Sequence, residues 1–185
     1  MKKIAGILVV AGGIILALNG CKKDETAVSP PLPGNEFLTT VQLVVTNTAD
    51  ATDVQTVSVK QLPDQPVDNS KAALTLKKNA VYTVQVKFLD ETKTPAGNVT
   101  DDISTRRNYH LICFVVSGGA NLTVVRTDQD TNTPALQVGL QDKFTTGAAS
   151  TGSINVQLRH QPNAKNGDCT PGSTDADVNY PVTIN

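Results

Sequence analysis

The chain has 185 residues, and its 16 Lys and Arg nearly balance its 17 Asp and Glu, which gives a formal net charge of −1. This balance argues against a protein that binds nucleic acid or an anionic membrane surface through its own charge. Tryptophan is absent and aromatic residues make up only 4% of the chain, whereas Thr and Val are plentiful, a composition that favours strands and turns.

The first twenty residues have the pattern of an export signal. Lys2 and Lys3 precede an uncharged apolar run from Ile4 to Leu18. As a helix, this run would measure about 22 Å, which is short of the ~30 Å hydrocarbon core of a bilayer. A cleaved signal peptide is therefore favoured over a membrane-spanning helix.

The residues Leu18, Gly20 and Cys21 resemble a bacterial lipobox, Leu-x-Gly/Ala-Cys. The resemblance implies cleavage after Gly20, a thioether-linked diacylglycerol on Cys21, and acylation of the new amine, for example with palmitate; two or more acyl chains give a stable anchor. The alternative is an ordinary secretory signal with an incidental cysteine. Residues 23–25 (Lys-Asp-Glu) resemble a surface-export tag of Bacteroidetes lipoproteins, although a charged tether explains them equally well.

The expected organisation is a signal peptide over residues 1–20, a lipidated cysteine with a proline-rich tether over 21–35, and one domain over 36–185. Within the domain, apolar and polar residues alternate with a period of two, which predicts strands. The spacing predicts an Ig-like antiparallel β-sandwich of about nine strands. The predicted strands lie at residues 41–45, 57–59, 74–76, 82–88, 112–116, 122–124, 136–140, 154–158 and 178–184.

Residues 100–107 depart from this alternation. Thr100 is a candidate N-cap, two aspartates follow it, and Arg106 and Arg107 end the segment. This charge order complements a helix dipole. The sequence therefore predicts one short helix inserted before the fifth strand.

Cys113 and Cys169 lie 56 positions apart. An exported protein permits a disulfide between them, which would stabilise the fold by a few kcal/mol. The alternative is that Cys113, in an apolar strand, packs as a small buried hydrophobe.

The only histidines, His110 and His160, stand at strand ends and share the apolar face of their strands. If the two ends meet, the imidazoles are candidates to bind zinc, copper or a haem iron, with Asp168, Cys169 or Asp175 as a third ligand. The alternative is a pair of strand-end histidines that hydrogen-bond to loops. The alternative is favoured because two residues fifty apart define no ligand spacing.

Asp128, Asp130 and Asn132 reproduce the first three oxygen positions of a calcium loop. The glycine expected at the sixth position is Thr133 and the glutamate expected at the twelfth is Gly139. A polar hairpin without a metal explains the same residues, and beyond these two metal hypotheses no cofactor is expected.

Asp175 and Asp177 are two residues apart, so both would face one side of a strand. Arg159, next to His160, is a candidate contact for an anionic ligand or a protein partner, or else an ion-pair partner of these aspartates. The chain contains no nucleophile motif. The sequence therefore predicts a protein that is not an enzyme and has no catalytic residue.

Most of the mature length resembles a group of exported lipoproteins of Bacteroidetes that carry no established activity. The likeness includes the strands at residues 38–41 and 82–90, and the matching positions are His110, Asp128, Asp130, Gly139, Leu140, Leu158, Arg159, His160, Pro162, Asp175, Asp177 and Val178. The resemblance implies a place near TonB-dependent receptors and a role in uptake.

The expected function is a lipid-anchored binding or accessory protein at the outer membrane, which captures a ligand for such a receptor. Its expected contacts are the membrane, through the lipid, and an outer-membrane receptor, with no nucleic acid. The alternatives are a passive structural or adhesion-type envelope lipoprotein, and a metal or haem carrier that uses His110 and His160.

Overall fold

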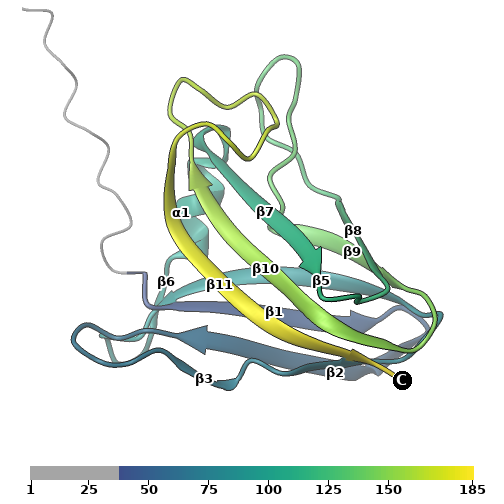
Figure 1. The fold of residues 1–185 in the computed structure, drawn as a ribbon. Coiled ribbons are helices and arrows are strands. Elements are labelled where there is room, and N and C mark those ends of the chain that lie inside the picture. The colour runs from purple at the N-terminus through teal and green to yellow at the C-terminus, as the bar shows by residue number, and fades with distance from the viewer. Residues whose placement is uncertain (1–37) are drawn as a thin grey trace, which may run out of the picture. The chain divides into compact units, whose positions relative to one another are not determined.

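Two β-sheets lie face to face in the computed structural model, which describes residues 38–185 (Figure 1). The predicted all-β sandwich with one short α-helix is confirmed. The predicted signal peptide, the lipidation site at Cys21 and the tether lie outside the described residues. Within the described part, no helix has the length and apolar character of a membrane span.

The larger sheet has seven strands in the order β3-β2-β1-β5-β9-β8, and the short β6 pairs with β5. All neighbouring strands in this sheet are antiparallel. The strands are β1 (Thr40–Asn47), β2 (Asp50–Lys60), β3 (Asp68–Lys71), β5 (Val81–Asp90), β6 (Gly97–Asn98), β8 (Leu122–Arg126) and β9 (Gln141–Thr146).

The smaller sheet has four strands in the order β4-β11-β10-β7. Its long strands β10 and β11 pair antiparallel, as do β10 and β7, whereas β4 runs parallel to β11. The strands are β4 (Leu74–Leu76), β7 (His110–Ser117), β10 (Ser150–His160) and β11 (Ser173–Ile184). In this register, His110 and His160 lie directly opposite each other.

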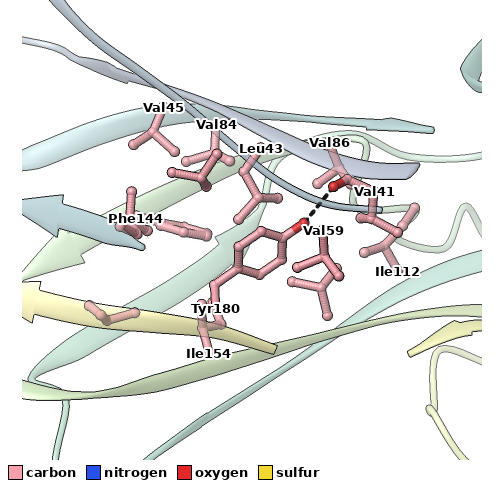
Figure 2. Close-up of a cluster of buried hydrophobic side chains, with 14 of the residues drawn as sticks. Val41, Leu43, Val45, Val59, Val84, Val86, Ile112, Phe144, Ile154 and Tyr180 are labelled. Atoms are coloured by element: carbon pink, nitrogen blue, oxygen red, sulfur yellow. Dashed lines mark hydrogen bonds between the residues drawn. The ribbon is translucent and has the colours of Figure 1, made fainter. Parts of the chain in front are cut away.

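Alternate apolar side chains from both sheets fill the space between them, as the period-two pattern requires. Tyr180 on β11 is fully buried among these side chains (Figure 2). Its hydroxyl donates a hydrogen bond of 2.7 Å to the main-chain oxygen of Val41 on β1. This bond satisfies the one polar group that the tyrosine brings into the core and links the two sheets directly.

The predicted strand at residues 136–140 is wrong. Val138 and Leu140 are buried, but they belong to the loop that joins β8 and β9. The strand lies further on, in β9, where Asp142 and Phe144 face inward. Two short strands, β3 and β6, were also missed, so the helix precedes the seventh of eleven strands rather than the fifth.

The predicted helix forms as α1 (Thr100–Thr105), followed by a 3-10 turn, η1 (Arg107–Tyr109). Its predicted cap is wrong, because the N-cap is Val99, whose side chain makes no capping hydrogen bond. The hydroxyl of Thr100 instead binds the main chain of Phe88, accepting from its N–H at 2.9 Å and donating to its C=O at 3.2 Å. Thr100 therefore fastens the helix to β5.

Candidate functional site

Three connecting segments meet at the end of the sandwich where β7 begins and β10 ends (Figure 1). They are α1 with η1 (residues 100–109), the β8–β9 loop (residues 127–140) and the β10–β11 loop (residues 161–172). Loops at one end of a β-sandwich are where such folds place binding residues.

The ammonium group of Lys165 joins all three segments. It lies in the β10–β11 loop, forms a 2.9 Å ion pair with Asp130 in the β8–β9 loop, and donates a 2.9 Å hydrogen bond to the main-chain oxygen of Arg107 in η1. The side chains of Lys165 and Asp130 are only 2% and 0% exposed. A buried lysine needs such partners, so this contact fixes the three segments relative to one another.

Asp130 is the acceptor around which the β8–β9 loop folds. Its carboxylate accepts the N–H groups of Leu136 at 2.8 Å and Asn132 at 3.0 Å. Burial alone would raise the pKa of Asp130, but the hydrogen bonds from Leu136 and Lys165 outweigh burial and hold this pKa below its usual value.

Two further amides strengthen the contact between the segments. The Asn108 side-chain oxygen accepts hydrogen bonds from the N–H and the hydroxyl of Thr131, at 3.0 and 2.9 Å. Gln161, which is fully buried, donates its main-chain N–H to the Tyr109 oxygen at 2.6 Å. Its side-chain amide also donates to the main-chain oxygen of Asp168 at 2.8 Å. These bonds order the loops before any ligand arrives.

Cys113 and Cys169 form a disulfide, with 6.0 Å between their Cα atoms. The bond pins the β10–β11 loop to β7, and Cys113 is also almost fully buried. Of the two alternatives left open for these cysteines, the structure therefore contains the disulfide.

The three segments surround a hollow of about 520 Å³, a volume that suits a small ligand. The only charged side chain in its lining is that of Lys165, which Asp130 neutralises. The other lining side chains are four asparagine amides, the hydroxyl-bearing Thr133 and Tyr109, and the apolar Pro134 and Leu136. The lining residues are Asn108, Tyr109, Asn132, Thr133, Pro134, Leu136, Asn163, Lys165 and Asn166.

Replacement of Lys165 tests this arrangement. Lys165→Met removes the ion pair but leaves Asp130 with its amide donors, so we expect the free energy of unfolding to fall by about 2 kcal/mol. Lys143→Met, which removes an exposed lysine of β9, is the matched control. Urea denaturation measures both variants. Equal effects of the two substitutions would contradict a structural role for Lys165.

The structure stacks the rings of His110 and His160, with 5.0 Å between centroids and 20° between planes. Nδ1 of His110 lies 3.1 Å from the main-chain oxygen of Arg106, so this nitrogen carries the proton and donates it. Nε2 of His110 lies 3.9 Å from a carboxyl oxygen of Asp175. The sequence pattern placed each histidine on the apolar face of its own strand and left open whether the two strand ends meet; the structure brings them together.

Stacked imidazoles direct their in-plane lone pairs side by side, not toward one point. Rings placed face to face also leave no room for a haem iron between their nitrogens. Among residues 38–185, no group of three or more His, Cys, Asp or Glu side chains is arranged to hold a metal ion. The observed geometry favours the alternative without a metal for His110, which hydrogen-bonds to Arg106, whereas the buried Nε2 of His160 has no hydrogen-bond partner among the described residues.

Burial, reinforced by the neighbouring His160, lowers the pKa of His110 to about 4, although the hydrogen bond to the main-chain oxygen of Arg106 opposes the shift. The unfolded chain therefore binds more protons than the folded protein between pH 6.5 and about 4, and stability is lost as pH falls through this range. We expect His110→Asn, whose side-chain amide takes the place of Nδ1–H as the donor to Arg106, to remove about 2 kcal/mol of the loss between pH 7 and pH 4.5. Denaturation of both proteins at pH 4.5 and 7 measures the difference, and identical pH dependence would contradict it.

The residues of the predicted calcium loop bind the protein's own amides. Asp128 accepts the N–H groups of Gly139 at 2.7 Å and Leu140 at 3.1 Å. The carboxylate of Asp130 is occupied as described above, and Asn132 donates its side-chain amide to Asp130 at 2.8 Å. This arrangement favours the hairpin interpretation over the calcium loop.

The prediction that Asp175 and Asp177 face one side of a strand is wrong. A register shift opposite Leu158 and Arg159 makes Asp175 the extra residue of a β-bulge. Asp175 turns toward His110, whereas Asp177 accepts the side-chain amides of Asn155 and Gln157.

Arg159 pairs with neither aspartate in the structure. Its guanidinium donates to the main-chain oxygens of Thr170 at 3.1 Å, Pro171 at 3.2 Å and Gly172 at 2.8 Å, and it also binds the Thr174 hydroxyl. Arg159 therefore closes the β10–β11 loop. The structure therefore does not contain the ion pair that was one of the two alternatives for Arg159, and these contacts leave the guanidinium little capacity for an anion.

Sequence reasoning missed Lys165, Gln161 and Asn108, which hold the loops together. A lysine, a glutamine and an asparagine in polar segments are normally solvated, and their partners lie far away in the sequence. Only the structure shows that these three side chains are turned inward.

Comparison of the chain with protein-family models, with curated proteins and with solved structures found no match in any of the three. The role of the hollow is therefore inferred from its own residues.

Proposed function

We propose that this chain is a lipid-anchored binding protein of the cell envelope, which captures a small neutral ligand in the loop hollow and presents it to an outer-membrane receptor. The observation that carries the proposal is the Lys165 contact, because it locks three loops around a hollow of about 520 Å³. A pre-ordered pocket loses less conformational entropy on binding than a mobile one.

The lining indicates the chemistry of the ligand. Amide groups of Asn132, Asn163 and Asn166 offer donors and acceptors, and Tyr109 and Leu136 offer less polar contacts. With Lys165 neutralised by its ion pair, a charged ligand would gain no partner of opposite charge. A neutral, polar molecule with one apolar face, such as a sugar or a short peptide, fits this lining.

The anchor rests on the sequence pattern around Cys21, which supports lipidation. Cells that express the full chain and are fed labelled palmitate should incorporate the label, and Cys21→Ala should abolish it. Absence of label in the unsubstituted chain would contradict an anchored role.

Binding is tested with the full chain in detergent and a panel of neutral mono- and disaccharides, neutral dipeptides, and their charged analogues. We expect ligands from the neutral set to raise the unfolding temperature, and Asn132→Leu to abolish the rise. Asn155→Leu, on the exposed face of β10, is the control. If no neutral compound binds, the passive envelope component is the better interpretation.

A further inference from the structure

One edge of β11 is open over more than half of its length. On one side β11 pairs with β10 from end to end, but on the other side β4 covers only Val182–Ile184. Among the described strands, none pairs with the outer edge of β11 from Ser173 to Pro181. An open edge of this kind presents main-chain groups that can pair with another strand.

The direction of the main-chain groups identifies which of them are available. The main-chain N–H of Asn185 donates a hydrogen bond to the main-chain oxygen of Leu76, and the main-chain oxygen of Asn185 accepts one from the N–H of Lys78. The main-chain groups of Asn185 therefore face the β4 side of β11. The direction of the main-chain N–H and C=O groups alternates from one residue to the next along a strand. The main-chain groups of Asp177 and Asn179 therefore face the same outer edge as those of Asn185. Pro181 shares this orientation, and its missing N–H therefore removes no bond to β10.

A groove of about 350 Å³ runs along this open edge, between β11 and the strands β1 and β2. Val41 and Val59 form part of its lining, and Val67 at the same groove is 52% exposed. The only charged residues of the lining are Asp175 and Asp177. The groove thus combines apolar surface, negative charge and a free strand edge.

We propose that this groove binds an extended segment of a protein partner, which adds a strand to the outer edge of β11 and carries Lys or Arg at alternate positions. Strand addition draws affinity from main-chain hydrogen bonds and specificity from alternate side chains. Apolar side chains of the segment would cover Val67, and its basic side chains would face Asp177. This docking surface is separate from the loop hollow and does not depend on the ligand proposed for that hollow.

A second copy of the same chain is a poorer occupant. Pairing of two β11 edges would bring the exposed Asp177 of one copy toward that of the other, and like charges in direct opposition are unfavourable. Sedimentation of the full chain should therefore show a monomer at micromolar concentration. A dimer that is lost in Asp177→Lys would overturn the proposal in favour of self-association.

The test uses the full chain and the synthetic peptide acetyl-Thr-Val-Lys-Val-Lys-Val-Thr-amide. In the free protein, the amide protons of Val178 and Tyr180 should exchange slowly, because they face β10, and those of Asp177 and Asn179 should exchange fast. Peptide binding should slow exchange at Asp177 and Asn179 by about tenfold or more and leave Val178 unchanged. Unchanged exchange at Asp177 and Asn179 in saturating peptide would overturn strand addition.

Charge reversal tests the specificity. Asp177→Lys should weaken binding of the lysine peptide by about tenfold and permit binding of the same peptide with glutamate in place of lysine. Asp101→Lys, an equal charge change on the exposed side of α1, should alter neither affinity. If both peptides bind equally to the unsubstituted chain, the groove does not select basic segments and the proposal fails.

Discussion

Replacement of Asp142 by asparagine should stabilise the protein at neutral pH. Asp142 on β9 is 2% exposed, and neither of its carboxyl oxygens has a hydrogen-bond partner within the described part of the chain. Burial, reinforced by the charge of Asp128, raises the pKa of Asp142 to about 8, although Arg126 opposes the shift. The folded protein therefore keeps a proton on this group that the unfolded chain releases near pH 4.

The sign of the effect follows from this difference in pKa. Stability contributed by the protonated carboxyl is fully present below pH 4 and is lost as pH rises toward 8. The free energy of unfolding of Asp142→Asn, relative to the unsubstituted chain, should therefore increase by about 4 kcal/mol between pH 4 and pH 7. Urea denaturation at the two pH values measures this increase.

The contacts of Arg126 explain why it does not form an ion pair with the buried Asp142. Although Arg126 lies opposite Asp142 in the β8–β9 register, its Nε donates to the main-chain oxygen of Ile112 at 2.6 Å, and its Nη2 lies 3.6 Å from the sulfur of Cys169. Asp177→Asn, at an exposed acid, is the control. Destabilisation of Asp142→Asn at pH 7 would show that Arg126 does pair with an ionised Asp142.

Removal of the disulfide should be the most damaging change to the loops. Cys113→Ala combined with Cys169→Ala releases a closed loop of 56 positions, for which chain entropy gives a loss of about 4 kcal/mol. The β10–β11 loop would then be held to β7 without its covalent link, and we expect fast amide exchange at Lys165 and Gln161 together with weaker ligand binding in the hollow.

The single cysteine variants provide the control for this prediction. Each of them removes the same bond, so either one should lose nearly as much stability as the pair. Chemical denaturation measures all three variants. A loss below about 1 kcal/mol in the double variant would show that the disulfide does not constrain the unfolded chain.

The sequence reveals the sandwich because most strands alternate apolar and polar residues. Tyr82, Val84, Val86 and Phe88 on β5 are all buried, as the pattern predicts. The pattern fails in β9 because one of its inward residues, Asp142, is charged and hides the strand. It misleads at residues 136–140 because buried residues of a loop can show a period of two, although this segment forms only an isolated bridge, between Gln129 and Gln137, and no strand.

The candidate site was only partly predictable for a different reason. The alternation of apolar and polar residues placed His110 and His160 each on the apolar face of its own strand, and the structure stacks their rings. The contact between Lys165 and Asp130 joins residues in separate loops, and no local pattern indicates such a pair. The β-bulge adds Asp175 to β11 as an extra residue, so its side chain points away from the side expected from strict alternation. The sequence pattern does not indicate this bulge.

The loop hollow is the central element of the proposed function, and amide chemical-shift mapping tests it most directly. The full chain in detergent would be titrated with the neutral sugars and dipeptides of the panel. The expected result is saturable shifts at Asn108, Tyr109, Asn132 and Asn166, with none in the groove beside β11. Shifts confined to that groove, or no shift with any compound, would contradict a ligand site in the hollow.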